Sequence, residues 1–246
     1  VARLRRAVVG SRYGDSVPSG HLIAANRSAL RASRMLVAPP QQRATVARLS
    51  DPFYAPTRYA HAMTRIVVVD NHGQFTHLEH RALRDLGIDT EIVDNDTPPE
   101  DVDADGIVLS GGPDMDRIGH SADYLDGDVP VLGICLGMQL IAEELGGRVD
   151  SGEYGGYADV TVEITDDDDP LVGSLAPETR VWASHADEVK EVPDGFVRTA
   201  KSDVCGVEAM SDTDRDLYGV QWHPEVAHTE RGEEVFENFL DICEEA

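Results

Sequence analysis

The run VLGICLGMQ, residues 131–139, joins an apolar segment to a helical pattern through one cysteine that is flanked by glycines. Residues 129–134 are typical of a buried parallel strand. Apolar residues at 136, 140, 141 and 145 then follow helical spacing until Gly146 and Gly147 end the pattern. The turn between them, G-x-C-x-G, has the form of a nucleophile elbow with cysteine in the place of serine. The sequence therefore predicts a strand, a sharp turn and a helix around Cys135.

Such an elbow would give Cys135 the surroundings of a nucleophile. It places the sulfur at the carboxyl end of a strand, where open α/β sheets form their sites, and at the N-terminus of a helix. The backbone N–H of Leu136 would point into the same space as half of an oxyanion hole. The alternative is an inert buried cysteine, a common state for a free thiol in a core.

From Met63 onward, strand and helix patterns alternate and then give way to short strands. Buried strands are predicted at 66–70, 90–93, 106–110 and 129–134, and a helix at 74–86 should bury Phe75, Leu78, Ala82 and Leu86. Short strands are predicted at 158–165, 179–182, 196–200, 204–210 and 217–221. A final helix at 233–242 should bury residues 235, 236, 239 and 240. We expect an α/β fold, a doubly wound and mostly parallel sheet with flanking helices and an added antiparallel or mixed section.

Composition restricts the class of protein. The chain has 246 residues, 41% of them hydrophobic, which is enough for one substantial core. Its three cysteines are odd in number and widely spaced, which argues against a disulfide framework or a CxxC metal site and fits a reducing cytoplasm. No segment approaches the roughly 18 apolar residues of a membrane span.

Charge divides the chain into two parts. The formal net charge is −25, yet residues 1–62 contain ten arginines, no lysine and only two acidic residues. The acidic remainder contains only two lysines, Lys190 and Lys201, and we expect it to repel nucleic acid and anionic membranes. This composition resembles that of proteins from salt-accumulating halophiles, where molar salt shortens the Debye length to about 3 Å.

Residues 1–62 differ from the rest and show no sustained periodicity. Three interpretations are open: an Arg-rich targeting peptide, a basic arm that binds nucleic acid, or an over-extended reading frame ahead of a working protein that starts at Met63. We favour the third, a disordered or spurious extension, because the first strand follows three residues after Met63. The functional domain is accordingly expected at 63–246.

A cysteine nucleophile needs a base, and the base needs an orienting group. His223 follows directly on the strand predicted at 217–221, at the edge where the elbow should also lie, and Pro224 takes the chain out of the sheet. Glu225 can fold back towards the imidazole and fix its tautomer. A lone histidine would be expected to be structural, but this arrangement predicts a triad of Cys135, His223 and Glu225.

Three other polar segments are placed to bind a substrate. The glycines at 111 and 112 follow a buried strand, so backbone N–H groups there could complete the oxyanion hole, although an ordinary turn explains them equally well. Gln139 lies one helical turn beyond Cys135 on the same side of the helix. Ser184, His185 and Asp187 form a polar cluster suited to a zwitterionic ligand.

No metal site is expected. The other histidines of the domain lack metal-ligand spacing and are interpreted as surface or structural residues: His72, His77, His80, His120 and His228. The run of four aspartates at 166–169 is expected to be a solvated turn rather than a cation site.

Together these segments resemble the class I (triad) glutamine amidotransferases. GICLGMQ at 133–139 and HPE at 223–225 carry the resemblance. Within that family, NHGQFTHL at 71–78, SGGP at 110–113, VWASHAD at 181–187 and GVQWHPEV at 219–226 are similar to the glutaminase subunits of two-subunit GMP synthases. The resemblance covers about Met63 to the C-terminus, with Ala186 and Trp222 standing where the family usually has Gly and Phe.

The resemblance implies that the chain hydrolyses glutamine. Cys135 would attack the side-chain amide, His223 would take and return the proton, and Glu225 would orient His223. The backbone N–H groups of Gly112 and Leu136 would hold the oxyanion. The substrate-binding residues that it implies are Gly111, Gln139, Ser184 and His185.

The resemblance also implies a partner. Ammonia would pass to a separate ATP-pyrophosphatase subunit that uses Mg-ATP to convert XMP to GMP. This chain has no S-G-G-x-D-S loop for that chemistry, since Pro113 follows Ser110-Gly111-Gly112. No metal or organic cofactor is implied for the glutaminase half.

Three alternatives remain open. A glutaminase subunit of anthranilate or carbamoyl-phosphate synthesis would keep the triad but differ around 182–187 and 224–229. A stand-alone cysteine hydrolase of γ-glutamyl compounds would be active without a partner. A non-catalytic binding module could use the same fold, because a fold alone does not prove activity.

Overall fold

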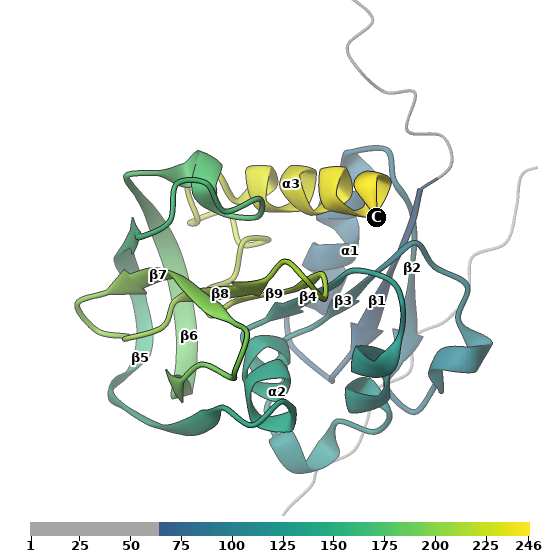
Figure 1. The fold of residues 1–246 in the computed structure, drawn as a ribbon, viewed down its shortest axis with the longest axis horizontal. Helices are drawn as coiled ribbons and strands as arrows, with labels where there is room; N and C mark the ends of the chain where they lie inside the picture. The colour runs from purple at the N-terminus through teal and green to yellow at the C-terminus, as the bar shows by residue number, and fades with distance from the viewer. Residues whose placement is uncertain (1–63) are drawn as a thin grey trace, which may run out of the picture. The chain divides into compact units, whose positions relative to one another are not determined.

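A nine-stranded mixed sheet is the centre of residues 64–246, the part of the chain that this computed structural model describes (Figure 1). Side chains are described throughout that range except at 153–158. The extension expected at 1–62 lies outside the described residues. The sheet has a parallel half and an antiparallel half, as the sequence predicts for a doubly wound fold with an added section.

Five parallel strands form one half of the sheet. They are β1 (Arg65–Asp70), β2 (Asp89–Asp94), β3 (Gly106–Leu109), β4 (Val131–Ile134) and β9 (Leu217–Val220). Their order across the sheet is β2-β1-β3-β4-β9. Ile134 pairs with Val220 in this register, so the ends of β4 and β9 lie level. The residues that follow these two strands therefore meet at one edge, where open α/β sheets form their sites.

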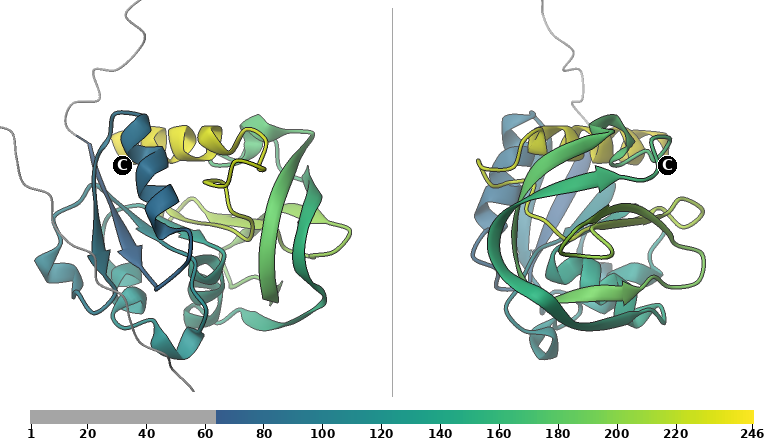
Figure 2. Two further views of the ribbon diagram at one scale, coloured as in Figure 1. Left: turned by 180° about the vertical axis from the view of Figure 1, so that it is seen from behind. Right: turned by 90° about the vertical axis from the view of Figure 1, so that its left-hand side faces the viewer.

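The antiparallel half continues outward from β9. It consists of β8 (Ala209–Asp212), β7 (Val197–Ser202), β5 (Arg148–Ile164) and β6 (Glu178–Glu191), in that order. Each neighbouring pair is antiparallel. The long strands β5 and β6 lie together at the outer edge and curve past the end of the sheet (Figure 2).

The outer strands differ from the prediction in their length. The sequence predicts strands at 158–165 and 179–182, whereas β5 begins at Arg148 and β6 continues to Glu191. The two strands pair again beyond a register shift, where Ser151 pairs with Asp187. The polar cluster at Ser184–Asp187, which follows the strand predicted at 179–182, therefore belongs to β6 itself. The strand predicted at 204–210 corresponds to the shorter β8, which begins only at Ala209 and ends at Asp212.

Helices cover both faces of the sheet (Figure 1). α1 (Thr76–Asp85) and α3 (Gly232–Glu245) lie on one face, and α2 (Leu136–Glu144) lies on the other. β1 shows the alternation that this arrangement requires: Ile66 and Val68 belong to the core under α1 and α3, and Val67 and Val69 belong to the core under α2. Short 3-10 helices are η1 (Pro99–Asp101), η2 (Met115–Arg117), η3 (Ser121–Asp126) and η4 (Gly173–Leu175). None of the helices within residues 64–246 is both long and apolar enough to span a membrane.

The predicted inner face of α1 is right at Leu86, which is buried, and at Ala82, which packs against the core, but wrong at Leu78. Leu78, expected in the core, is 38% exposed, and the residues that α1 itself buries are Thr76, Glu79 and Leu83. Thr76 turns inward because its hydroxyl donates to Oδ1 of Asp70 at 2.8 Å. Two polar residues therefore occupy a face that periodicity assigns to apolar ones. By contrast, the inner face of α3, at residues 235, 236, 239 and 240, is buried as predicted.

The aspartate run at 166–169 is only partly the solvated turn that the sequence predicts. Asp167 and Asp168 are exposed, but Asp169 is buried. Its Oδ1 accepts hydrogen bonds from the backbone N–H groups of Leu171 and Val172 at 3.0 and 2.7 Å. Asp169 therefore stabilises a turn, as a short acidic side chain commonly does.

Glu208 is a buried carboxyl group just before β8. Its side chain is inaccessible to solvent, and its Oε1 accepts a hydrogen bond from the hydroxyl of Ser202 at 2.7 Å. Burial, together with the charge of Glu188, outweighs the Ser202 hydrogen bond and raises the pKa of Glu208 from 4.5 to about 7. The folded chain therefore keeps a proton on Glu208 at a pH where the unfolded chain has lost it.

This raised pKa predicts a pH-dependent contribution to stability. The contribution is fully present below about pH 4.5 and is lost as pH rises through about 7. From pH 5 to pH 8 we expect the free energy of unfolding of the parent chain to fall by about 2 kcal/mol relative to that of a Glu208→Gln variant. Urea unfolding in molar KCl at the two pH values measures it, with the exposed Glu163→Gln as control. A difference that does not change with pH would contradict the prediction.

Candidate active site

Cys135 lies in the sharp turn between β4 and α2, with φ 54° and ψ −102°. A positive φ is uncommon for a residue with a Cβ, and strained turns of this kind cluster at functional sites. The turn is fixed on both sides. The N–H of Cys135 donates to the carbonyl of Val220 at 2.8 Å, and its own carbonyl accepts from the N–H of Gln139 at 3.1 Å. The structure therefore has the elbow that the sequence predicts.

His223 and Glu225 lie beside the elbow. Nδ1 of His223 is 2.7 Å from Oε1 of Glu225, and both side chains are buried. On its other side, His223 lies beside Cys135, with which it lines one cavity and interacts electrostatically. The carboxylate can only accept, so Nδ1 donates to it, which leaves Nε2 for the sulfur. The structure thus brings the three predicted triad residues together in the order that acyl transfer requires.

Cys135 and Glu225 alter the protonation of the His223 imidazole. Burial alone would lower the pKa of His223, but hydrogen bonds to Cys135 and Glu225, and the charges of both groups, raise it to about 10. The unfolded chain loses this proton near 6.5. The stabilisation from this raised pKa is therefore complete below about pH 6.5 and is lost as pH rises through 10. At neutral pH, His223 holds a proton that a leaving group can take.

The surrounding chain holds His223 in place. The ring of Phe75 contacts the imidazole edge-on, with centroids 4.8 Å apart and an interplanar angle of 71°. The hydroxyl of Thr229 donates to the carbonyl of His223 at 2.7 Å and accepts from the N–H of Trp182 at 3.0 Å. The loop that carries the base is therefore tied both to β6 and to the start of α1.

The two residues predicted to supply the oxyanion hole, Gly112 and Leu136, lie close together. Leu136 is the first residue of α2, so its N–H has no intrahelical partner. A Cβ on Gly112 would lie 2.6 Å from Cδ2 of Leu136 and 2.5 Å from the carbonyl oxygen of Asn71. Only glycine fits at so close an approach. A Cβ on the neighbouring Gly111 would lie 3.2 Å from Cε1 of His223, so this loop also contacts the base.

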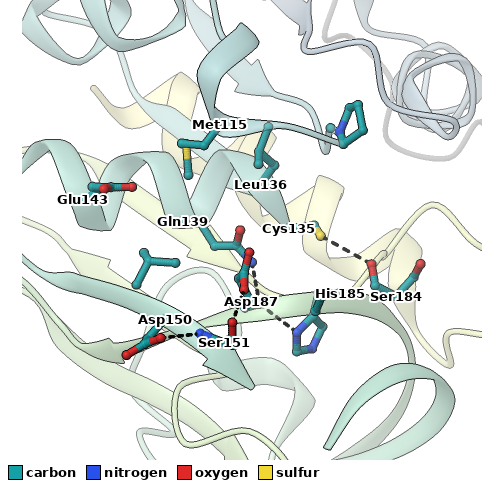
Figure 3. A pocket seen from close by; sticks show the side chains of 14 residues that line it. Met115, Cys135, Leu136, Gln139, Glu143, Asp150, Ser151, Ser184, His185 and Asp187 are labelled. Carbon is teal, nitrogen blue, oxygen red and sulfur yellow. Dashed lines mark hydrogen bonds between the residues drawn. The ribbon is translucent and has the colours of Figure 1, made fainter. Parts of the chain in front are cut away.

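A cavity of about 420 Å³ opens beside Cys135 (Figure 3). Cys135 and Leu136 lie on its wall, together with Gln139 and the Ser184–Asp187 segment of β6. Its lining also includes the carboxylates of Glu143, Asp150 and Asp187, and no lysine or arginine of the described residues contributes to it. A ligand with a cationic amino end fits this electrostatic environment.

Gln139 and β6 shape the wall of this cavity. The amide nitrogen of Gln139 donates to the carbonyl of Asp187 at 2.7 Å, so its carbonyl oxygen is left to accept from a ligand. Nδ1 of His185 donates to the same carbonyl at 3.0 Å, and burial lowers the pKa of His185, which favours a neutral imidazole. The thiol of Cys135 points towards the carbonyl of Ser184, at 3.8 Å (Figure 3).

Sequence reasoning missed Gln221. The sequence assigns it only to the end of a strand, yet its amide nitrogen donates to Sγ of Cys135 at 3.7 Å and its carbonyl accepts from Gln139 at 3.2 Å. The side chain is fully buried. A glutamine in an otherwise apolar run, two residues before His223, was the signal that could have revealed this position.

Comparison with known proteins identifies the family. A sequence profile described as glutamine amidotransferase class-I matches residues 67–243. A protein of Natronomonas pharaonis, named as the A subunit of a glutamine-hydrolyzing GMP synthase, is 84% identical over 181 residues, which is 74% of this chain and 98% of that protein. Proteins of the same name from Haloarcula marismortui and Halobacterium salinarum are 80% and 75% identical, each over 74% of this chain and over 97% and 100% of their own lengths. The acidic composition agrees with these halophilic relatives.

Solved structures agree with this result. One from Thermoplasma acidophilum, described as a candidate A subunit of GMP synthase, is 40% identical with a TM-score of 0.71, over 74% of this chain and 95% of that one. A glutamine amidotransferase from Thermotoga maritima, at 21% identity and a TM-score of 0.57 over 74% of this chain and 84% of that one, supports the fold alone. The chain therefore belongs to the class I glutamine amidotransferase family and groups there with the GMP synthase A subunits.

Proposed function

We propose that this chain is the glutaminase subunit of a two-subunit GMP synthase. It hydrolyses glutamine to glutamate and ammonia, and it delivers the ammonia to a separate ATP-pyrophosphatase subunit that converts XMP to GMP. The observation that carries the proposal is the line of contacts from Cys135 through His223 to Glu225 at the wall of a cavity. The names of the A-subunit relatives support the choice of pathway.

The first step is attack on the side-chain amide of glutamine. Cys135 passes its proton to His223, a bond forms between its sulfur and the amide carbon, and the N–H groups of Gly112 and Leu136 stabilise the negative oxygen. His223 gives its proton to the amide nitrogen, the C–N bond breaks, and ammonia leaves. Glu225 holds the imidazole in the tautomer that this transfer needs and stabilises its positive charge.

The second step releases glutamate. Water attacks the thioester carbon while His223 accepts one of its protons, and the C–S bond breaks. The same two backbone N–H groups stabilise the second tetrahedral intermediate. The glutamyl group leaves as the free acid, and the sulfur of Cys135 and the imidazole return to their starting state.

The amino-acid end of the substrate occupies the acidic part of the cavity. The carbonyl of Gln139 accepts from the α-amino group, and the carboxylates of Glu143 and Asp187 attract its positive charge. Ser184 and His185 border the remainder of the ligand, and Gly111 holds the loop against the base. These contacts orient the side-chain amide towards Cys135.

The glutaminase half needs no metal or organic cofactor, because nucleophile, base and oxyanion donors all come from this chain. Mg-ATP belongs to the partner, which activates XMP. The two alternative glutaminase pathways would use the same triad with another acceptor. A stand-alone hydrolase would use the triad without any ammonia acceptor.

The test uses glutamine labelled with ¹⁵N at the side-chain amide. The chain is mixed in molar KCl with the ATP-pyrophosphatase subunit of the same genome, XMP and Mg-ATP, beside an excess of unlabelled ammonium. We expect GMP to carry ¹⁵N, and we expect none when this chain is omitted. Free glutamate with no labelled GMP would refute the pathway and favour a stand-alone hydrolase. Absence of both products, in a mixture that still uses ammonium, would refute glutamine hydrolysis itself.

A further inference from the structure

Glu79 is a fully buried carboxyl group for which the proposed reaction has no use. It lies on the inner face of α1 with no exposed surface. Among residues 64–246, neither of its oxygens has a well-formed hydrogen bond, and the backbone N–H of Gly111 offers it only a weak one. Buried polar groups almost always have partners, so an exception requires an explanation.

Glu225 contributes another carboxyl oxygen without a partner. Its Oε1 accepts from His223, but Oε2 is buried and has no hydrogen-bond partner among the described residues. Glu79 interacts electrostatically with both Glu225 and His223. Two carboxyl groups, one from α1 and one from the loop after β9, therefore act on the same imidazole.

Glu79 also lies next to the reacting groups. It lines a second cavity, of about 460 Å³, together with Gly111, Gly112, Cys135 and His223. This cavity shares Cys135 with the substrate cavity. Glu79 is therefore close to the nucleophile, the base and the loop of the oxyanion hole.

The surroundings of Glu79 disfavour its ionised form. Glu225 forms an ion pair with His223. Burial and then the charge of Glu225 raise the pKa of Glu79 well above its usual value. His223 and the Gly111 N–H lower it less, and Asp70, from β1, raises it further. Glu79 therefore keeps its proton to a higher pH than an exposed glutamate does.

We propose that Glu79 is a positioning residue of the triad, a neutral acid that steadies Glu225 and the Gly111 loop. The inference rests on the proposed function. Neutral Glu79 has an O–H to offer Oε2 of Glu225 and an oxygen to accept from Gly111. Ionised Glu79 would be a second anion beside the protonated His223 and would draw the imidazole away from Cys135.

Two substitutions separate these roles. Glu79→Gln keeps a donor and an acceptor but cannot ionise, whereas Glu79→Leu fills the space and offers neither. We expect the Gln variant to keep kcat within about threefold at pH 7, and the Leu variant to lose about tenfold in kcat with KM unchanged, the effect of one buried hydrogen bond. In both variants the alkaline decline of activity should move upward by about one pH unit, because the titrating group is gone. Asp85→Asn, an exposed position on the same helix, is the matched control and should change neither quantity.

A second readout does not depend on glutamine hydrolysis. The rate at which iodoacetamide alkylates Cys135, followed by peptide mass against pH, reports the state of the triad directly. We expect its alkaline limb to shift in Glu79→Gln but not in Asp85→Asn. A shift in a chain that does not hydrolyse glutamine would uphold this inference while the proposed function fails. A parental pH profile in Glu79→Gln would overturn it, and that variant decides the matter even if Glu79→Leu does not fold.

Discussion

The His223→Asn variant is expected to hydrolyse glutamine at least about 10⁴-fold more slowly than the parent chain. The asparagine amide can take the place of Nδ1 and donate to Oε1 of Glu225, so the buried carboxylate keeps a partner. The asparagine side chain has no proton-accepting atom at the position of Nε2. Cys135 therefore loses its proton acceptor, and the departing ammonia loses its proton donor. Glutamate release by the two-subunit mixture in molar KCl measures the effect.

Two controls separate loss of chemistry from loss of structure. His228→Asn changes an exposed histidine on the same loop, whose ring is 5.5 Å from Trp182, and should leave the rate within about twofold. Synthesis of GMP from free ammonium should be unchanged in both variants, because that route bypasses the triad. A His223→Asn variant that retains a tenth of the parental glutaminase rate would show that another group acts as the base.

The sequence predicts the central site well because its determinants are local. G-x-C-x-G is itself the turn, so the pattern contains the geometry of Cys135. His223 directly follows a strand, and strand order alone places the end of β9 beside the end of β4. Gly112 and Leu136 lie close together for the same reason, because they follow the neighbouring parallel strands β3 and β4. These positions depend on topology and need no knowledge of side-chain packing.

Features that depend on contacts between distant segments were not predicted. The hydrogen bond from Thr76 to Asp70, and not the pattern of apolar residues, determines which face of α1 is buried. Periodicity therefore places Leu78 in the core and overlooks Glu79. Ser184 lies on a strand because β6 continues past Trp182 and pairs there with Tyr157 of β5, and a short-range alternation pattern does not reveal that pairing. Gln221 acquires its role from two residues more than 80 positions away.

The geometry of the site does not identify the pathway that uses the ammonia. Triad and oxyanion hole define the cleavage of an amide, but they are the same whichever acceptor receives the ammonia. The choice of XMP as acceptor rests on segments such as 181–187 and 219–226, which the resemblance and the relatives supply. The physical argument therefore ends at glutamine hydrolysis, and the labelled-amide experiment supplies the remaining step.

A Gly137→Ala substitution is expected to destabilise the chain by about 3 kcal/mol and to lower glutamine hydrolysis by about 100-fold. An added Cβ would lie 2.2 Å from the carbonyl oxygen of Leu109 and 3.0 Å from its carbonyl carbon. Those atoms are backbone of β3, which pairs with strands on both sides and cannot yield. The first turn of α2 must therefore move away from the sheet, and it carries Cys135 and the Leu136 N–H with it.

The loss of activity should exceed what the loss of stability explains. Urea unfolding in molar KCl gives the free-energy change, and glutaminase assays at a temperature where the variant is fully folded give the rate. Gly206→Ala is the matched control, because a Cβ there meets nothing within 4 Å, and it should change stability by less than about 0.5 kcal/mol. If Gly137→Ala were as active as Gly206→Ala, the close approach of α2 to β3 would not determine the position of the nucleophile. A folded variant with a displaced sulfur would show that the glycine sets the geometry of catalysis as well as the packing of the turn.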